Sequence, residues 1–272
     1  MMNGFRKAVR DWLPPAVVRM IRQNSGRATT FTGNYASWAA ACASSDGYEK
    51  PDICAKAVAA ARAVRDGSAA FERDTVLFAE PEANWPVLAC LLRAAACHGG
   101  RLHVVDFGGA LGSTWWQHRS WLQDLPEVKW EVLEQRSFVE VGRHEFEVGP
   151  IRFRDSLDAC SVDPTTSILL FSSVLPYLES PHALLEEGVR RKFQHVAIDR
   201  TGFMRTGGDR LTVQHVPLSI YCASYPSWFF DREKLLRVFG PPYRLINEWS
   251  SLDEVNIDAE YRGMLFERVP TV

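Results

Sequence analysis

Apolar side chains recur along this chain at two spacings, and beyond residue 100 the two spacings alternate. Apolar residues three and four positions apart predict helices, whereas short continuous apolar runs predict buried strands. Helical spacing predicts helices over residues 51–66 and 84–98. Asn84 suits the N-cap of the second helix, and Gly99 and Gly100 end it.

The alternation after residue 100 predicts an α/β fold. Strands are expected over 102–106, 129–133, 151–153, 167–171 and 195–198, the last ending at Asp199. Helices are expected over 113–122, 181–192 and 231–239, and a final strand pair over 243–249 and 261–269. Strands separated by helices run parallel, so the pattern predicts a mostly parallel sheet with an antiparallel C-terminal edge pair.

Polar residues stand where four of these strands end. They are Asp106, Glu134, Ser172 and Asp199. Ligands of such folds bind at the carboxyl ends of the parallel strands. We therefore expect the four side chains to converge on one cleft.

The turn after the strand at 102–106 is rich in glycine. Gly108, Gly109 and Gly112 follow Asp106 in the pattern D-x-G-G-x-x-G. Glycine lets a ligand lie against the backbone, and the free N–H groups of the next helix, from Ser113, face that ligand. The spacing differs from G-x-G-x-x-G, and Ala110 replaces one glycine of the D-x-G-x-G-x-G pattern common in methyltransferases.

Two carboxylates favour S-adenosylmethionine over NAD as the cofactor. Glu134 ends the next strand, where an acid can accept hydrogen bonds from ribose hydroxyls. A dinucleotide pyrophosphate disfavours a neighbouring acid, whereas Asp106 suits a cationic amine. The other residues expected to line the cofactor are Phe107, Ser113, Gln135, Asp155, Ser156, Ser172, Ser173 and Val174. Of these, Asp155 and Ser156 are expected near the adenine amine, and Ser172 to Val174 near the methyl donor.

Composition limits the remaining possibilities. The 272 residues are 46% hydrophobic, which allows a sizeable core, and a net charge of −2 gives no global field for nucleic acid. Six cysteines without a C-x-x-C pair favour reduced thiols, and no spacing indicates a metal site. Neither a membrane-spanning run nor a signal peptide is present in the pattern, so a cytoplasmic protein is expected.

The N-terminal part is expected to be a separate helical cap over residues 1–98, with the cofactor-binding domain over 99–272 and an insert at 200–230. The basic, amphipathic segment 1–24 suits either peripheral contact with an anionic membrane or packing on the main domain. Residues 31–50 are expected to form a loop, in which Tyr35 and Trp38 could form a pocket wall.

Several segments, taken together and in order, resemble a bacterial family of class I S-adenosylmethionine-dependent methyltransferases. The segments are GNYASW (33–38), DGYE (46–49), DFGGALGSTWWQHRSWL (106–122), WEVLEQRSFVEVG (130–142), SSVLPYLESP (172–181), IDRTGF (198–203) and RLTVQHVPLSIYCASYPSWFF (210–230). That family is commonly found among genes for O-antigen, capsule and other surface glycans. The resemblance implies a Rossmann-like, seven-stranded sheet whose last two strands are the pair at 243–249 and 261–269.

The acceptor side is expected on the insert and at the end of the strand at 195–198. If the acceptor is a sugar hydroxyl, a base must take its proton, and Asp199 and His215 are candidates, with Tyr225 as a positioning group. Residues proposed to hold the substrate are Tyr35, Trp38, Arg200, Arg210 and Tyr221. The arginines suit a phosphate or carboxylate on a nucleotide sugar or lipid-linked glycan.

Three functions remain open from the sequence. The first is a methyltransferase acting on a glycan or glycan precursor. The second is an NAD-linked sugar oxidoreductase or epimerase, which the off-register glycines and the C-terminal strand pair disfavour. The third is a catalytically silent protein that binds the cofactor or partners of glycan assembly.

Overall fold

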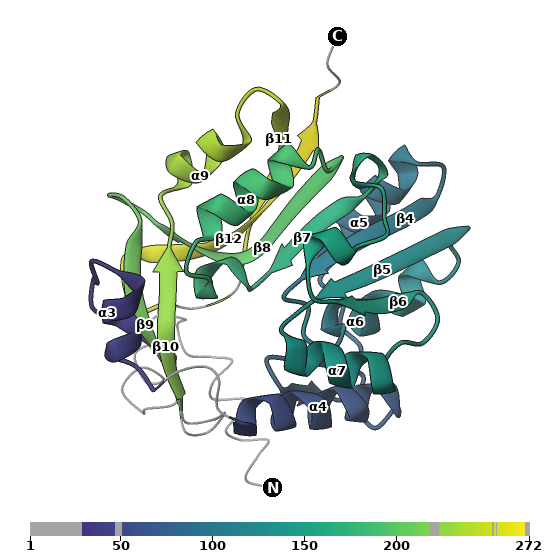
Figure 1. Ribbon diagram of the computed structural model, residues 1–272, viewed down its shortest axis with the longest axis horizontal. Helices are drawn as coiled ribbons and strands as arrows, with labels where there is room; N and C mark the ends of the chain where they lie inside the picture. Colours follow the sequence, from purple (N-terminus) through teal and green to yellow (C-terminus); the bar gives the residue numbers. More distant parts are fainter. Residues whose placement is uncertain (1–28, 47–50, 218–222, 252, 254, 270–272) are drawn as a thin grey trace, which may run out of the picture.

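A central sheet with helices on both faces dominates the computed structural model, and a smaller sheet lies at one side of it (Figure 1). The structure describes residues 29–46, 51–217, 223–251, 253 and 255–269. The basic segment 1–24 and Tyr221 lie outside the described residues. No helix in the described part of the chain is long and apolar enough to cross a membrane.

Seven strands form the main sheet, as the sequence predicts. Their spatial order is β11 (Tyr243–Ser250), β12 (Ala259–Arg268), β8 (His195–Met204), β7 (Ile168–Ser172), β4 (Arg101–Phe107), β5 (Glu127–Leu133) and β6 (Ile151–Arg154). The five strands from β8 to β6 are parallel, and β12 runs antiparallel to both β8 and β11. This order and the antiparallel edge pair confirm the expected Rossmann-like methyltransferase fold.

One strand is longer than its sequence pattern indicates. The strand expected to end at Asp199 continues to Met204. β12 pairs with this extension, joining Arg262 to Thr201 and Ala259 to Met204. The partner strand therefore extends β8 beyond the residues that its own apolar run predicts.

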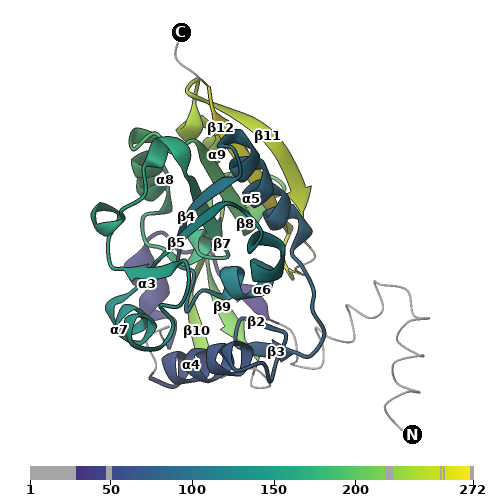
Figure 2. The same cartoon turned by 90° about the vertical axis from the view of Figure 1, so that its right-hand side faces the viewer.

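Two separate cores hold helices against the two faces of the sheet (Figure 2). One core joins the sheet to α4 (Pro51–Arg65), α5 (Trp85–Cys97), α6 (Ser113–Leu122) and α7 (Arg136–Glu145). The other joins it to α8 (Pro181–Arg190) and α9 (Arg232–Phe239). Because α4 and α5 share a core with β4 and β5, described residues on both sides of the expected 98/99 boundary pack together.

Asn84 caps α5 as predicted, since its side chain accepts a hydrogen bond from the Val87 amide. Asp231 caps α9 in the same way through the amide of Lys234. Short polar residues at these positions satisfy backbone donors that a helix start leaves open. Both helices therefore begin within one residue of the positions expected from the sequence.

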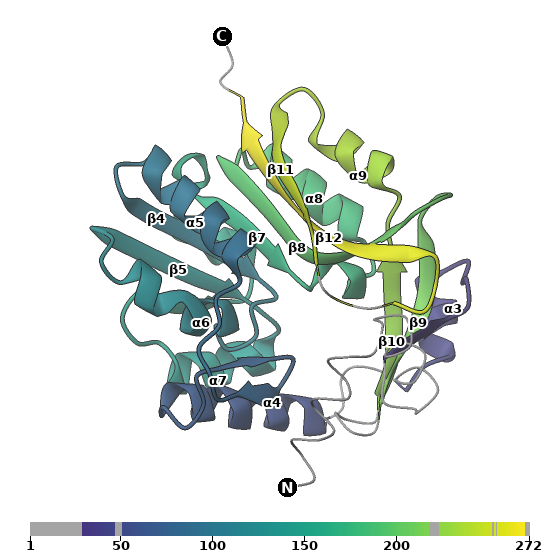
Figure 3. The ribbon, with the colours of Figure 1, turned by 180° about the vertical axis from the view of Figure 1, so that it is seen from behind.

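The insert forms a second sheet with residues from the N-terminal region. β1 (Thr30–Thr32) pairs with β9 (Arg210–Val216), which pairs with β10 (Ala223–Phe229), all antiparallel. The helix α3 (Trp38–Ala43) packs on this sheet beside the main one (Figure 3). The loop expected over 31–50 is thus wrong in part, because β1 forms only against a strand of the distant insert.

The hairpin of β2 (Phe71–Arg73) and β3 (Val76–Phe78) was not predicted from the sequence. Its turn residues, Asp74 and Thr75, both have positive φ angles, of 53° and 67°. Asn-Gly or Asp-Gly is the usual sequence of such a turn, and a β-branched residue there is strained. The pair Asp-Thr therefore carries little hairpin signal.

Candidate active site at the carboxyl edge of the main sheet

The carboxyl ends of the parallel strands bring the expected polar residues together. We call the edge where β4 to β8 end the carboxyl edge. Gly108 donates its amide to the carbonyl of Leu133, at 2.8 Å, which joins the ends of β4 and β5. Ser173 donates its amide to the carbonyl of Asp199, at 3.0 Å, which joins the ends of β7 and β8. The glycine turn thus lies beside Glu134 on one side and the β7 loop on the other.

Glycine is required at the first position of the turn. Gly108 has a φ of 69°, and a Cβ there would lie 2.3 Å from the Cγ2 atom of Val174. Gly112 has a φ of 87° and leaves equally little room, since a Cβ would lie 2.3 Å from Ile151. Ala110, which replaces a glycine of the usual pattern, also has a positive φ of 50°. The turn therefore keeps a left-handed conformation at Ala110 without glycine.

Asp106 lies behind the glycine turn and is fully buried. Its Oδ2 atom accepts a hydrogen bond from Trp130 Nε1 at 3.1 Å, and a Cβ on Gly109 would lie 2.5 Å from its carboxyl group. Burial raises the pKa of Asp106 to about 7. Its Oδ1 atom has no hydrogen-bond partner among the described residues. In this conformation the carboxyl group offers no exposed surface to a cationic amine.

Glu134 faces the glycine turn directly. Its Oε1 atom accepts a hydrogen bond from the amide of Ala110 at 3.1 Å, and its Oε2 atom accepts one from Gln135 at 2.8 Å. Burial raises the pKa of Glu134, although the side chain is partly exposed. The carboxylate is thus held against the turn itself, where it can also accept hydrogen bonds from hydroxyl groups of a ligand.

The end of β6 brings further expected residues beside Glu134. The amide of Glu134 donates to the carbonyl of Arg154 at 3.1 Å. The next two residues of the chain, Asp155 and Ser156, therefore begin beside Glu134. Both residues are exposed, as is Gln135 at the start of α7. These side chains are accessible to a base that extends from a ribose held by Glu134.

Asp199 joins four elements at the other end of the carboxyl edge. Its Oδ2 atom accepts hydrogen bonds from Asn84 Nδ2 at 2.8 Å and Ser172 Oγ at 3.4 Å. Its Oδ1 atom accepts one from Trp249 Nε1 at 3.0 Å. The side chain is buried, and this burial raises its pKa. The partly exposed Ser172 hydroxyl lies between this carboxyl group and the edge.

The insert contributes a polar cluster next to the β7 loop. Tyr177, which ends the short helix η3 (Leu175–Tyr177), donates its hydroxyl to Gln214 Oε1 at 3.0 Å. Gln214 in turn donates its side-chain amide to the hydroxyl of Tyr225 at 3.2 Å. Trp228 fixes β10 to the same loop by donating to the carbonyl of Leu178 at 3.1 Å. Tyr225 is therefore connected through Gln214 to Tyr177, in the segment that follows β7.

His215 does not face this cluster. It is exposed on β9 and its Nε2 atom lies 3.0 Å from the hydroxyl of Thr32 on β1. Side chains alternate between the faces of a strand, so His215 shares a face with Val213, which packs on α3. His215, which the sequence suggested as a candidate base, therefore lies on the opposite face of the small sheet from Gln214 and Tyr225.

Three other substrate candidates also have structural contacts of their own. Tyr35 and Trp38 pack against Leu211 and Val213 on the α3 side of the small sheet. Arg210 donates from Nε and Nη2 to the carbonyl of Gly33, at 3.0 and 2.8 Å. These residues hold the segment before α3 on β9, so in this conformation they build the small sheet's core and edge.

Arg200 forms ion pairs rather than an open anion site. Its guanidinium donates to Asp74 at 2.7 Å and to both oxygens of Asp253 at 3.2 Å. The two carboxylates raise the pKa of Arg200 well above its usual value against the effect of burial. The arginine therefore joins β8 to the turn of the β2–β3 hairpin, and its charge is already balanced.

Glu72, Asn84, Tyr177 and Gln214 are site residues that the sequence reasoning missed. Glu72 accepts a hydrogen bond from the hydroxyl of Ser113, the first residue of α6 after the glycine turn. A local signal existed only for Asn84, as a helix cap. The others reach the carboxyl edge through a strained hairpin, a short helix and an insert, none of which has a strong local pattern.

The residues at the carboxyl edge fit a ligand with an adenosine and an amino-acid end. The glycine turn passes so close to Val174 and Ile151 that a Cβ at Gly108 or Gly112 would overlap them. Glu134 places an acid next to the glycine turn, and α6 begins directly after Gly112. No group of acidic, cysteine or histidine side chains in the described residues could hold a metal ion.

No protein-family model and no curated protein sequence matches this chain. Among solved structures, the N-terminal domain of EvdMO1, crystallised with S-adenosylhomocysteine and D-fucose, is 16% identical with a TM-score of 0.45, over 82% of this chain and 97% of that one. Burkholderia thailandensis 1,6-didemethyltoxoflavin-N1-methyltransferase is 14% identical with a TM-score of 0.41, over 82% and 92%. CalS10, an amino pentose methyltransferase from Micromonospora echinaspora, is 10% identical with a TM-score of 0.43, over 68% and 90%. Likeness at this level says nothing of a substrate, and the fold rests on this chain's own strand order.

Proposed function

We propose that this protein is an S-adenosylmethionine-dependent methyltransferase. The observation that carries the proposal is the hydrogen bond of Glu134 to the Ala110 amide, which holds an acid beside the glycine turn at the carboxyl edge. An acid in this place suits the two hydroxyls of a ribose. The antiparallel β12 within the sheet also differs from the order of the dinucleotide-binding fold, which disfavours the NAD-linked alternative.

The expected cofactor residues divide along the carboxyl edge by their chemistry. Glu134 would accept the ribose hydroxyls, with Gln135, Asp155 and Ser156 toward the base. The backbone of the glycine turn and the first amides of α6 would meet the amino-acid end. Ser172, Ser173 and Val174 would lie toward the sulfonium, which supplies an electrophilic methyl group when the cofactor is bound.

The protein's own part in such a reaction is to hold an acceptor and take its proton. We propose a hydroxyl of a sugar or glycan precursor as the acceptor. The partly exposed Tyr177 would contact the sugar, and the buried Gln214 and Tyr225 hold its hydroxyl and ring in place. Ser172 can accept the proton of the acceptor hydroxyl while giving its own to Asp199, with which it is hydrogen-bonded.

The cofactor proposal predicts that substitution of Gly108 by alanine abolishes micromolar binding of S-adenosylhomocysteine. The new Cβ would overlap Val174 and would sit at a left-handed φ. Isothermal titration calorimetry of the full chain tests this. Gly149→Ala is the matched control, because Gly149 also has a positive φ, of 58°, but open space around it. Wild-type protein that is folded yet binds no S-adenosylhomocysteine would contradict the proposal.

The acceptor proposal predicts that Asp199→Asn lowers kcat by about 100-fold or more, the usual contribution of a positioned base. The measurement is S-adenosylhomocysteine release with a panel of nucleotide sugars and lipid-linked sugars. Unchanged cofactor binding in the variant would separate the loss from misfolding. Cofactor binding by the wild type with no turnover on any acceptor would instead favour a catalytically silent protein.

A further inference from the structure

The β2–β3 hairpin reaches the glycine turn from outside the main sheet. Glu72 on β2 accepts a hydrogen bond from the side chain of Ser113, and its Oε2 atom accepts the amide of Thr75 at 3.0 Å. Ser113 follows Gly112 and is the first residue of α6. A carboxylate from a distant segment is thus fixed within one hydrogen bond of the helix that starts at the turn.

Polar and aromatic contacts hold the hairpin in this place. Asp74, in the strained turn, pairs with Arg200 at 2.7 Å. Phe71 is buried, and its ring stacks on Phe78 with centroids 4.5 Å apart. Non-glycine residues keep a positive φ only where the surroundings enforce it. The backbone strain at Asp74 and Thr75 therefore indicates that the tertiary contacts, rather than local preference, place Glu72.

Glu72 is a largely buried acid that forms no ion pair with a cation of the described residues. The loss of water around it raises its pKa, although the residue keeps some exposed surface. Its two hydrogen-bond donors, Ser113 and Thr75, are both neutral. The charge of Arg200 lowers the pKa of Glu72, but this guanidinium is itself paired with Asp74 and Asp253. A positive group supplied by a ligand would complete the charge balance.

The amino-acid end of the proposed cofactor supplies such a group. Its carboxylate and its ammonium are attached to the same carbon atom. The carboxylate suits the N-terminal amides of α6, where a helix favours an anion. The ammonium would then lie next to Ser113, the first residue of that helix and the hydrogen-bond partner of Glu72. Asp106 is a poorer partner, because it is fully buried under Gly109 and bonded to Trp130.

We propose that Glu72 binds the α-ammonium group of the cofactor. This inference rests on the proposed cofactor and adds to it a residue from a hairpin that precedes the sheet. In this proposal two carboxylates bind different ends of the ligand: Glu134 binds the ribose and Glu72 binds the amino-acid end. A ligand that lacks the amino-acid end should therefore depend on Glu134 and not on Glu72.

The test compares S-adenosylhomocysteine with 5′-methylthioadenosine, which keeps the adenosine but lacks the ammonium and the carboxylate. Calorimetry measures both probes with the wild type, Glu72→Gln and Glu134→Gln. We expect Glu72→Gln to weaken S-adenosylhomocysteine by about 10- to 100-fold, as for a lost hydrogen bond between charged groups, and to leave 5′-methylthioadenosine unchanged. Glu134→Gln should weaken both probes.

Each other outcome has a distinct meaning. If the folded wild type binds neither probe, the proposed cofactor itself is wrong. If the wild type binds both and Glu72→Gln leaves S-adenosylhomocysteine unchanged, or weakens both probes equally, the ammonium role is overturned and Glu72 only holds the start of α6. If Glu72→Gln does not fold, Glu72→Asp is used instead, because it keeps the charge but moves the carboxylate away from Ser113. The same comparison of the two probes then tests the ammonium role.

Discussion

At the scale of single residues, burial decides which ionisable groups are available to a ligand. Asp106 and Asp199 both end or interrupt strands at the carboxyl edge, but indole N–H groups of Trp130 and Trp249 already bind them. Glu134 keeps some exposed surface beside the turn. The acids that the sequence groups together thus divide into those that hold the site and those that can contact a ligand.

His195 gives a residue-scale prediction about pH. Its side chain is fully buried, and burial lowers its pKa from 6.5 to about 4. Below pH 6.5 the unfolded chain takes up a proton that the folded chain refuses, so stability falls as the pH falls toward 4. Between pH 7 and pH 5 the loss should reach about 2 kcal/mol.

Urea unfolding of the wild type and His195→Gln at pH 7 and pH 5 measures this loss. Glutamine does not titrate, so the variant should lose less stability between the two pH values. The two proteins must be compared with each other because Asp106 has the reverse effect. Its pKa is raised to about 7, so the stability that it contributes is lost as the pH rises. If both proteins lose the same unfolding free energy between pH 7 and pH 5, His195 is not responsible for the loss.

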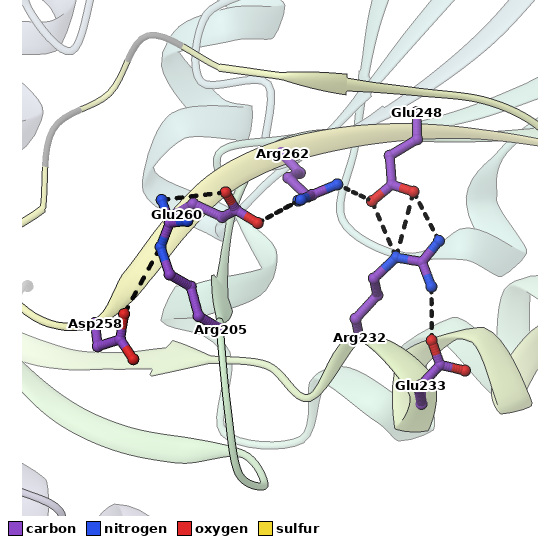
Figure 4. Close-up of polar contacts among 7 residues, drawn as sticks. All are labelled: Arg205, Arg232, Glu233, Glu248, Asp258, Glu260 and Arg262. Carbon is purple, nitrogen blue, oxygen red and sulfur yellow. Dashed lines mark hydrogen bonds and ion pairs between the residues drawn. The ribbon is translucent and has the colours of Figure 1, made fainter.

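At the scale of elements, an ion-pair network fixes α9 and the antiparallel edge pair (Figure 4). Glu248 on β11 accepts hydrogen bonds from Arg232 on α9, at 2.8 Å, and from Arg262 on β12, at 2.9 Å. Arg262 also pairs with Glu260, which Arg205 contacts at 3.3 Å. The hydrogen bond from Arg232 lowers the pKa of Glu248, and Arg262 acts in the same direction against burial.

The network predicts that Glu248→Gln destabilises the protein by about 1–2 kcal/mol, since one carboxylate serves two cations. Glu233→Gln is the matched control. Glu233 also pairs with Arg232, but its side chain is 70% exposed, so its loss should cost less than about 0.5 kcal/mol. Urea unfolding compares them, and equal small losses would argue that the network contributes nothing. High salt should reduce the difference in unfolding free energy between the two variants, because it screens the charges.

At the scale of the whole molecule, segments from both ends of the chain build the neighbourhood of the site. Phe31 on β1 packs edge-to-face on Phe229 of β10, with ring centroids 4.9 Å apart, and joins a cluster with Tyr261 of β12. The small sheet is thereby attached to the extended end of β8 and to β12. Gln214 and Tyr225, which we propose support the acceptor side, consequently lie on a sheet that β1 completes.

The sequence by itself determined the strands of the main sheet, their alternation with helices along the chain, and the glycine turn beside Glu134. These features have local signals: continuous apolar runs, helical spacing, caps such as Asn84, and glycines at positive φ. Each signal lies within a few residues of the feature it specifies. The pattern also predicted the edge pair, which the pairing of β12 with β8 and β11 confirms, and the resemblance to a methyltransferase family added the seven-stranded, Rossmann-like arrangement.

Only the tertiary structure decided which side chains reach the site. Strand alternation placed His215 on the face of β9 that carries Val213 and α3, and Arg200 is engaged in ion pairs with Asp74 and Asp253. A strained hairpin brought Glu72 to Ser113. These outcomes depend on contacts between residues far apart in the chain, and the charge, direction and burial of a side chain follow from such contacts rather than from its neighbours in sequence.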